Sequence, residues 1–325
     1  MKNVVLIGGG TGLSAMVKGF KNIEDVNLTA IITVADDGGS TGRIRDAYNV
    51  PAMGDIRHVL CAMAKEEEDS IFTELMNYRF VGDQDVGGHQ LGNLIFLALI
   101  NITGSFMGAI ASIRKLLNVE GAIYPATLDN AVLYALMGDG TLVRGEKNIP
   151  SKQNHISKVF YQDQIHAYPE AIEAIQQADL IAYGIGSLYT SILPAVIVKD
   201  ISEAIAQSLA PKVYFCNAMT QPGETEGYSL EDHVRAIEAH TYKNPVSLVV
   251  YNDAKIEQDV LDRYAKLGST PVQMQEEDHM YQVISKELTV VDETGRIRHD
   301  SDKLAQCLVE ILESIEKESY NVIFK

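Results

Sequence analysis

The chain has 325 residues, of which 27 are lysine or arginine and 44 are acidic, so its formal net charge is −17. This balance excludes a broad nucleic-acid surface, because such a surface needs a basic face that displaces counterions from phosphates. The three cysteines, Cys61, Cys216 and Cys307, lack metal-site spacing and are expected to be reduced, mostly buried thiols.

The sequence also predicts a location. The longest purely apolar run, Leu94 to Ile100, is far shorter than the roughly 20 residues that span a bilayer. Met1 is followed directly by a predicted strand, without the charged and apolar regions of a signal peptide. We therefore expect a cytoplasmic protein with neither membrane nor nucleic-acid partners.

The first predicted elements alternate between strand and helix. Val4–Ile7 is predicted to be a buried strand, Leu13–Phe20 a helix and Leu28–Val34 a second strand. A long helical region follows at Leu94–Leu117, with an interruption near Gly104. This alternation is typical of a mostly parallel sheet with helices on both faces.

The middle of the chain has a different character. In "AVLYALMGDGTLVRGE", two extended runs are joined by Gly138-Asp139-Gly140, which predicts a β-hairpin. We interpret residues 120–165 as a hairpin excursion from one continuous α/β body that covers residues 1–325.

The α/β alternation returns at Pro169. The expected elements are a helix through Ala178 and strands at Leu180–Ala182, Val213–Cys216 and Leu248–Tyr251. A last helix is expected behind the cap candidate Ser301, with one apolar stripe formed by Leu304, Leu308, Ile311 and Ile315.

A glycine-rich loop follows the first predicted strand in "NVVLIGGGTGLS". A strand, a glycine loop and a helix together place backbone N–H groups at one point, which suits a phosphate. The loop lacks the GK[ST] ending of a Walker motif, and it fits the dinucleotide fingerprint only as Gly10-x-Gly12-x-x-Ala15. A tight turn that only reverses the chain is the alternative.

The second predicted strand ends in "TVADDGGSTGRIRD". In a dinucleotide-binding fold, an acid at the position of Asp36 or Asp37 accepts hydrogen bonds from ribose hydroxyls. Two adjacent carboxylates could instead hold Mg²⁺ against a phosphate. The same loop carries Ser40 and Arg43, and a solvated acidic turn is the structural alternative.

Three more polar loops adjoin apolar elements, in "GGHQLGNLIF", "YGIGSLYTSI" and "CNAMTQPGETEG". Loops at the carboxyl ends of parallel strands meet in one crevice, so together they suggest a phosphorylated ligand. His89 in the first loop is either a general base, a hydrogen-bond donor to a phosphate or a structural histidine. No nucleophile, base or metal triad is evident from the spacing.

Seven stretches resemble a known family in chain order, from the first strand to about residue 235. They are "IGGGTGLS", "VADDGGSTGRIR", "MGDIRHVL", "HQLGNL", "GTLVRGE", "GSLYTSILP" and "CNAMTQPGETEG". They closely resemble the gluconeogenesis factors, the YvcK-type branch of the CofD-like superfamily. The resemblance implies a three-layer α/β/α fold of Rossmann-related, CofD-like type. Ile185 departs from the family's Gly-Pro-Gly-Ser loop.

The family resemblance implies a function. Its members are associated with binding UDP-sugars such as UDP-N-acetylglucosamine, and with growth and cell shape on gluconeogenic carbon sources. Related 2-phospholactate transferases use a nucleotide-activated substrate and magnesium. The predicted ligand-binding residues are Gly9, Gly10, Thr11, Gly12, Asp36, Asp37, Ser40, Arg43, His89, Asn93, Gly186, Ser187, Asn217 and Thr220.

Three functional hypotheses follow. The first is a nucleotide-sugar-binding regulatory protein that is not an enzyme. The second is a magnesium-dependent transferase of a phosphorylated metabolite, with Asp36 and Asp37 as metal ligands. The third is an NAD-dependent oxidoreductase, because NAD shares the diphosphate that the loops would bind. A homo-oligomer is expected; the sequence does not identify a protein target.

Overall fold

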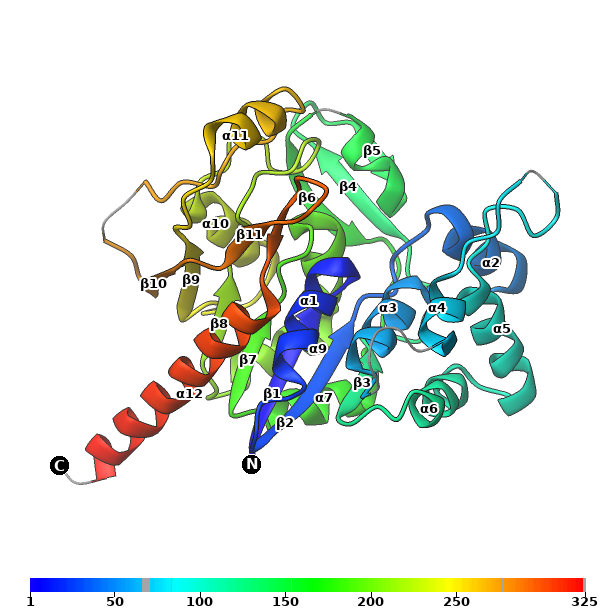
Figure 1. Ribbon diagram of the computed structural model, residues 1–325, viewed down its shortest axis with the longest axis horizontal. Coiled ribbons are helices and arrows are strands. Elements are labelled where there is room, and N and C mark those ends of the chain that lie inside the picture. Colours follow the sequence, from blue (N-terminus) through cyan, green and yellow to red (C-terminus); the bar gives the residue numbers. More distant parts are fainter. Residues whose placement is uncertain (66–70, 83, 153, 276–277, 324–325) are drawn as a thin grey trace.

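A seven-stranded parallel sheet forms the centre of the molecule in the computed structural model, which describes all residues except 66–70, 83, 153, 276–277 and 324–325 (Figure 1). The strand order is β10-β9-β8-β7-β1-β2-β3. The strands are β1 (Lys2–Gly8), β2 (Val26–Ile32), β3 (Ala122–Pro125), β7 (Leu180–Tyr183), β8 (Lys212–Phe215), β9 (Leu248–Asn252) and β10 (Gln282–Lys286). The chain builds outward from β1 to β3 and then returns to the other side of β1, so the strand order reverses between β1 and β7.

Two apolar cores lie on opposite faces of this sheet. Along β1, Val4 and Leu6 belong to one core and Val5 and Ile7 to the other, as the two-residue period of a strand requires. The first core is covered by α1 (Gly10–Phe20), α3 (Gly54–Met63), α6 (Phe106–Leu116) and α12 (Ser301–Ile323). The second is covered by α7 (Pro169–Gln176), α8 (Leu193–Val196), α9 (Lys199–Gln207) and α10 (Leu230–His240). The predicted α/β fold with a mostly parallel sheet is therefore confirmed.

The helices α5 (Leu91–Thr103) and α6 form the helical region expected at Leu94–Leu117, with the interruption at Gly104 that the sequence predicted. Gly104 ends α5 with a φ of +75°, a left-handed conformation that favours glycine, and Ser105 begins α6 by accepting the Gly108 N–H. No single helix in the described ranges is long and apolar enough to cross a membrane; α5 and α6 pass that test only together, across a bend of 118°.

Within the described residues, two antiparallel sheets lie outside the central one. The predicted hairpin is confirmed as β4 (Leu133–Met137) and β5 (Leu142–Arg144), and β6 (Ile156–Tyr161) adds a third strand beside β4. Near the C-terminus, β11 (Thr289–Val291) pairs with β12 (Ile297–His299), a hairpin that the sequence analysis missed. The remaining elements are α2 (Gly39–Tyr48), α4 (Ile71–Asn77), α11 (Gln258–Ala265), the 3₁₀ turns η1 (Glu146–Asn148) and η2 (Pro150–Lys152) and the π-helix η3 (Leu188–Ile192).

The expected cap of the last helix is wrong by one residue. Asp300 Oδ1 accepts the backbone N–H groups of Asp302 at 2.9 Å and Lys303 at 3.0 Å, so Asp300 provides the cap. Ser301 instead donates its hydroxyl to the carbonyl of Ala15 at 3.0 Å. This contact holds the start of α12 against α1.

Candidate functional site

The glycine loop after β1 lies against the loop after β7, at the point where the strand order reverses. The Gly184 N–H donates to the carbonyl of Ile7 at 2.9 Å. A Cβ on Gly12 would lie 2.5 Å from the backbone nitrogen of Gly186, so the two backbones approach too closely for a side chain. Two of the predicted ligand loops are therefore in direct contact.

The N-terminus of α1 begins at Gly10, earlier than the predicted Leu13, and its first N–H groups are partly used by the protein itself. The Gly10 N–H hydrogen-bonds to the carboxyl group of Asp55. A Cβ on Gly9 would lie 2.4 Å from Asp55 Oδ2 and 2.7 Å from Thr33 Cγ2. Packing within the protein therefore requires glycine at position 9, whether or not a ligand binds there.

A cavity of about 720 Å³ opens beside the N-terminal half of α1. Of the predicted residues, Thr11, Gly12, Gly186, Ser187 and Asn217 line it. The Asn217 amide donates to the Gly186 carbonyl at 2.9 Å, which links the loops after β7 and β8. The loops after β1, β7 and β8 therefore meet at this cavity, whereas His89 and Asn93 of the remaining predicted loop do not line it.

The C-terminal quarter completes the cavity, which the sequence did not indicate. Tyr264 of α11 and Arg298 and His299 of β12 line it, together with Lys18 of α1 and His58 of α3. Figure 1 shows α1 between α3 and α12, and it contacts both. Burial lowers the pKa of both His58 and His299 to about 4, so these imidazoles are neutral at pH 7.

A cluster of carboxyl groups lies on the other side of the glycine loop. Burial and the charge of Asp36 raise the pKa of Asp55 to about 7. Burial and the neighbouring acids Asp36, Asp37 and Asp55 raise the pKa of Glu146 to about 8. The pKa of Asp36 is raised as well, chiefly by burial. The sequence pointed to Asp36 and Asp37 but missed Asp55 and Glu146.

The carboxyl groups of this cluster do not form a complete metal site by themselves. Among the residues that the structure describes, no three His, Cys, Asp or Glu side chains are grouped to hold a metal ion. Asp36 Oδ1 accepts the Gly38 N–H of its own loop at 2.8 Å, and Asp37 Oδ1 accepts the Lys147 N–H of η1 at 3.0 Å, so both carboxylates already have backbone partners. Mg²⁺ bound by this pair would need phosphate oxygens or water for the rest of its shell.

Ser40, Arg43, His89 and Asn93 form a separate polar network around the starts of α2 and α5. Ser40 Oγ lies 3.1 Å from His89 Nδ1 and accepts from the Asn93 amide at 3.2 Å, and Arg43 donates to the Gly87 carbonyl at 2.8 Å. Asn93 is completely buried. Its side chain also donates to Thr41, which in turn hydrogen-bonds to Asp36, so the network adjoins the carboxyl cluster rather than the cavity.

Thr220 does not line the cavity. Its N–H donates to the Thr270 carbonyl at 2.7 Å, and its own carbonyl accepts the hydroxyl of Ser269. The side chain is almost fully buried. Thr220 therefore contributes to the loop after β8 through its backbone pairing, and its contact with a ligand stays a prediction.

Glu224, from the "CNAMTQPGETEG" stretch, is a further residue that sequence reasoning missed. Its buried carboxyl group accepts the Tyr189 N–H at 3.1 Å and the Thr190 hydroxyl at 2.9 Å. It thereby satisfies donors at the start of η3 that Ser187, the residue before this helix, leaves unbonded. Burial raises the pKa of Glu224 to about 7.

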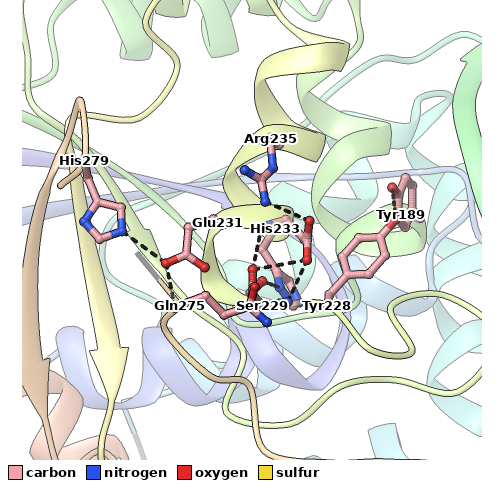
Figure 2. Close-up of polar contacts among 9 residues, drawn as sticks. Tyr189, Tyr228, Ser229, Glu231, His233, Arg235, Gln275 and His279 are labelled. Atoms are coloured by element: carbon pink, nitrogen blue, oxygen red, sulfur yellow. Dashed lines mark hydrogen bonds and ion pairs between the residues drawn. The ribbon is translucent and has the colours of Figure 1, made fainter. Parts of the chain in front are cut away.

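A second network of polar contacts links η3, the start of α10 and the segment before β10 (Figure 2). The Tyr189 and Tyr228 hydroxyls are 2.8 Å apart, and Ser229 begins α10 with a reciprocal capping pair to Asp232. Glu231 Oε1 accepts the Gln275 N–H at 3.0 Å and lies 3.1 Å from His279 Nε2. The Glu231 contacts join α10 to the segment before β10, and the hydroxyl pair joins Tyr228 to Tyr189 of η3.

The strand order and the cavity at its reversal point define a doubly wound, Rossmann-like α/β protein. A model of the family described as 2-phospho-L-lactate transferase CofD matches residues 4–289. The chain therefore belongs to the CofD family, and within it to the gluconeogenesis factors.

Relatives and a solved structure cover nearly the whole chain. It is 42% identical over 312 residues to the gluconeogenesis factor of Bacillus subtilis, which covers 95% of this chain and 98% of the relative. It is 40% identical over 314 residues to the gluconeogenesis factor of Halalkalibacterium halodurans, covering 95% and 96%. The crystal structure of a UPF0052 family member from Bacillus halodurans aligns with a TM-score of 0.90 at 40% identity, covering 94% of this chain and 99% of that chain.

Proposed function

We propose that this protein binds a nucleotide sugar, such as a UDP-sugar, and acts as a regulatory protein. The proposal is based on the cavity at the point where the strand order reverses. Thr11, Ser187 and the N-terminus of α1 border this cavity. Hydroxyl groups and helix N-termini bind phosphate oxygens. The volume of about 720 Å³ lies within the range of small-molecule sites.

The other residues that line the cavity suit the base, the charge and the sugar of such a ligand. Tyr264 offers an aromatic ring for a base, and Lys18 and Arg298 bring positive charge to a protein that is otherwise strongly acidic. The neutral imidazoles of His58 and His299 can hydrogen-bond to hydroxyl or carbonyl groups. A nucleotide sugar has a partner for each of these groups. Its base would lie on the aromatic ring, its diphosphate near the positive charges, and its sugar hydroxyls near the neutral imidazoles.

The biological role follows the relatives' name. Because they are called gluconeogenesis factors, we propose that this protein supports growth on gluconeogenic carbon sources. A role in cell shape would follow if the ligand is a cell-wall precursor. Deleting the gene and comparing growth and morphology on glycolytic and gluconeogenic carbon sources tests both roles.

Isothermal titration with UDP-N-acetylglucosamine tests the binding directly. We expect saturable binding, weakened about tenfold or more by Arg298→Ala, because a charge-assisted contact is worth about 1.5–3 kcal/mol. Arg296→Ala is the matched control, since Arg296 lies two residues away and does not line the cavity. The absence of binding at millimolar ligand would remove the proposal, and titrations with UDP and NAD show which part of the ligand is recognised.

A second candidate function is a magnesium-dependent transferase of a phosphorylated metabolite. It is favoured by the carboxyl groups with raised pKa beside the glycine loop, which are typical of catalytic sites, and by the description of the CofD family. Consumption of a nucleotide-activated donor that requires Mg²⁺ and is lost in Asp37→Ala would support it. A hydride-transfer assay separates NAD binding from NAD chemistry.

A further inference from the structure

The hairpin of β11 and β12 brings Arg298 to the cavity, although its position on the strand does not direct the side chain there. Ile297 and His299, on either side of Arg298 along β12, line the cavity as well. Because side chains alternate between the two faces of a strand, Arg298 starts from the opposite face. Its side chain is 51% exposed. A long, exposed arginine samples many rotamers unless a neighbouring group holds it.

Asp292, directly after β11, is a neighbour on that opposite face. Arg298 is paired with Val290 in the antiparallel register, so Asp292 is its diagonal neighbour, two residues further along the chain from Val290. Asp292 Oδ2 lies 3.6 Å from Arg298 Nε. A carboxylate beside Nε leaves the two terminal amino groups of the guanidinium available for a phosphate, which they can bind with two parallel hydrogen bonds.

The turn of the hairpin holds the Asp292 carboxylate in place. Asp292 Oδ1 accepts the Thr294 N–H at 2.9 Å, the Thr294 hydroxyl at 2.6 Å and the Arg296 N–H at 2.9 Å. These hydrogen bonds, that of the Thr294 hydroxyl first, lower the pKa of Asp292, so the carboxylate is charged at pH 7. One oxygen therefore ties the carboxylate to the turn, and the other faces Arg298.

The hairpin is attached to α11 as well. The Arg263 side chain donates to the Gly295 carbonyl at 3.2 Å, and the Tyr264 hydroxyl accepts the Ile297 N–H at 2.9 Å. Gly295 has a φ of +75°, and a Cβ there would lie 2.5 Å from Arg263 Nη1, so the turn packs closely on this helix. The turn that carries Asp292 is therefore fixed relative to Tyr264, which lines the same cavity.

We propose that Asp292 is a positioning residue that holds the Arg298 guanidinium at the cavity, where it binds the diphosphate of the ligand. This inference rests on the proposed function, because it concerns how the nucleotide sugar is bound. Among the described residues that line the cavity, Arg298 is included and Asp292 is not. An arginine that is ordered before binding loses less conformational entropy when the ligand arrives, so its contact contributes more to the affinity.

The same carboxylate has a second conceivable effect, that of a plain negative charge near the ligand. Asp292 would then repel the diphosphate, and removal of its charge would strengthen binding. Positioning and repulsion therefore predict changes in affinity of opposite sign for one substitution.

Asp292→Asn separates the two effects. Asparagine keeps an oxygen that accepts the hydrogen bonds of the turn, but it places an uncharged amide beside Arg298. Titration with UDP-N-acetylglucosamine is expected to give an affinity about three- to tenfold below that of the wild type. Glu293→Gln is the matched control, since it removes the same charge from the neighbouring, exposed residue and should leave the affinity unchanged. An unchanged or higher affinity in Asp292→Asn, or an equal loss in Glu293→Gln, overturns the inference.

A double-mutant cycle tests whether the effect of Asp292 passes through Arg298. In the Arg298→Ala background, Asp292→Asn is expected to change the affinity by no more than about twofold, because no guanidinium is left to position. An equal loss of affinity in both backgrounds would mean that Asp292 acts through the turn or through another residue, and the inference would be wrong.

The wild-type titration distinguishes failure of the proposed function from failure of this inference. A wild type that binds no UDP-N-acetylglucosamine removes both, whereas a wild type that binds it as well as Asp292→Asn does removes the inference alone. NMR relaxation of the Arg298 Nε–H group gives a measurement without ligand. This group should be more rigid in the free wild type than in free Asp292→Asn, and equal mobility in the two proteins overturns the positioning role.

Discussion

An alanine Cβ at position 12 would lie 2.5 Å from the nitrogen of Gly186 and 2.6 Å from the carbonyl oxygen of Ile185. Both contacts are with backbone atoms, which cannot rotate away. Gly12→Ala is therefore expected to separate the loops after β1 and β7, at a cost of about 1–3 kcal/mol in the free energy of unfolding. Because both loops line the cavity, affinity for UDP-N-acetylglucosamine should fall as well.

Titration and urea denaturation of the same preparation check this prediction. Gly140→Ala is the control, because Gly140 has a φ of +85° but no atom within 4 Å of its Cβ position, at the tip of a distant hairpin. It should lose about 1 kcal/mol of stability through backbone strain and keep its affinity. Equal loss of affinity in the two variants would show that the contact between the loops is irrelevant to binding.

The residues that sequence reasoning found share a local signal. Gly12, Ser187 and Asn217 each follow a buried strand in a polar, glycine-bearing loop, and the rule that such loops meet at one edge of the sheet brings them together. Asp55 and Glu146 lack this local signal, because neither follows a strand of the central sheet. They lie in the quoted stretches MGDIRHVL and GTLVRGE, but only the fold brings both beside Asp36. Arg298 was missed for the same reason.

At the scale of elements, the central strands were predictable because their residues are buried on both faces and read as continuous apolar runs. The strands β6, β10 and β12 lack such runs, since each exposes part of its length and has at most six residues. Their pairing depends on neighbours that are distant in sequence. Thus β12, which borders the cavity, could not be placed from its own residues.

The junction between β12 and α12 gives a prediction at this scale. Asp300 caps α12 through two backbone N–H groups, so Asp300→Ala should lower the free energy of unfolding by about 1 kcal/mol. Asp300→Asn should stay close to the wild type, because asparagine caps as well as aspartate. Urea denaturation of the three proteins measures the difference. A loss of the same size in both variants would mean that the charge, and not the cap, stabilises α12.

For the whole molecule, the sequence predicted one crevice, and the structure divides the predicted residues into two regions that adjoin the glycine loop. Thr11 and Ser187 border the cavity, whereas Asp36 and His89 lie among the carboxyl groups and the network around α2. Asp55 connects the regions through its hydrogen bond to Gly10. Sequence order gives the edge of the sheet to which a loop belongs, but side-chain packing decides which way each residue faces.

These buried groups make the stability of the whole molecule depend on pH. Asp55, Glu146 and Glu224 have raised pKa values of about 7, 8 and 7, so the folded protein retains protons that the unfolded chain releases above about pH 4. Their contribution therefore falls as pH rises toward these values. His58 and His299 act in the opposite direction, because their lowered pKa of about 4 makes stability fall as pH drops below about 6.5.

Between pH 6.5 and 8.5 the folded protein loses protons from the three carboxyl groups, and this outweighs the smaller, opposite effect of the two histidines, whose unfolded-state pKa is about 6.5. The free energy of unfolding should therefore decrease across this interval. Glu146 is expected to account for about 1 kcal/mol of the decrease, after allowance for its partial exposure to solvent. Glu146→Gln removes the charge and should flatten the profile, making the variant more stable than the wild type at pH 8.5.

Glu238→Gln, an exposed substitution on α10, is the control and should leave the slope unchanged. Urea denaturation at both pH values measures the slope; an unchanged slope in Glu146→Gln would mean that this carboxyl group is already ionised at pH 6.5 and that the cluster tolerates its charge.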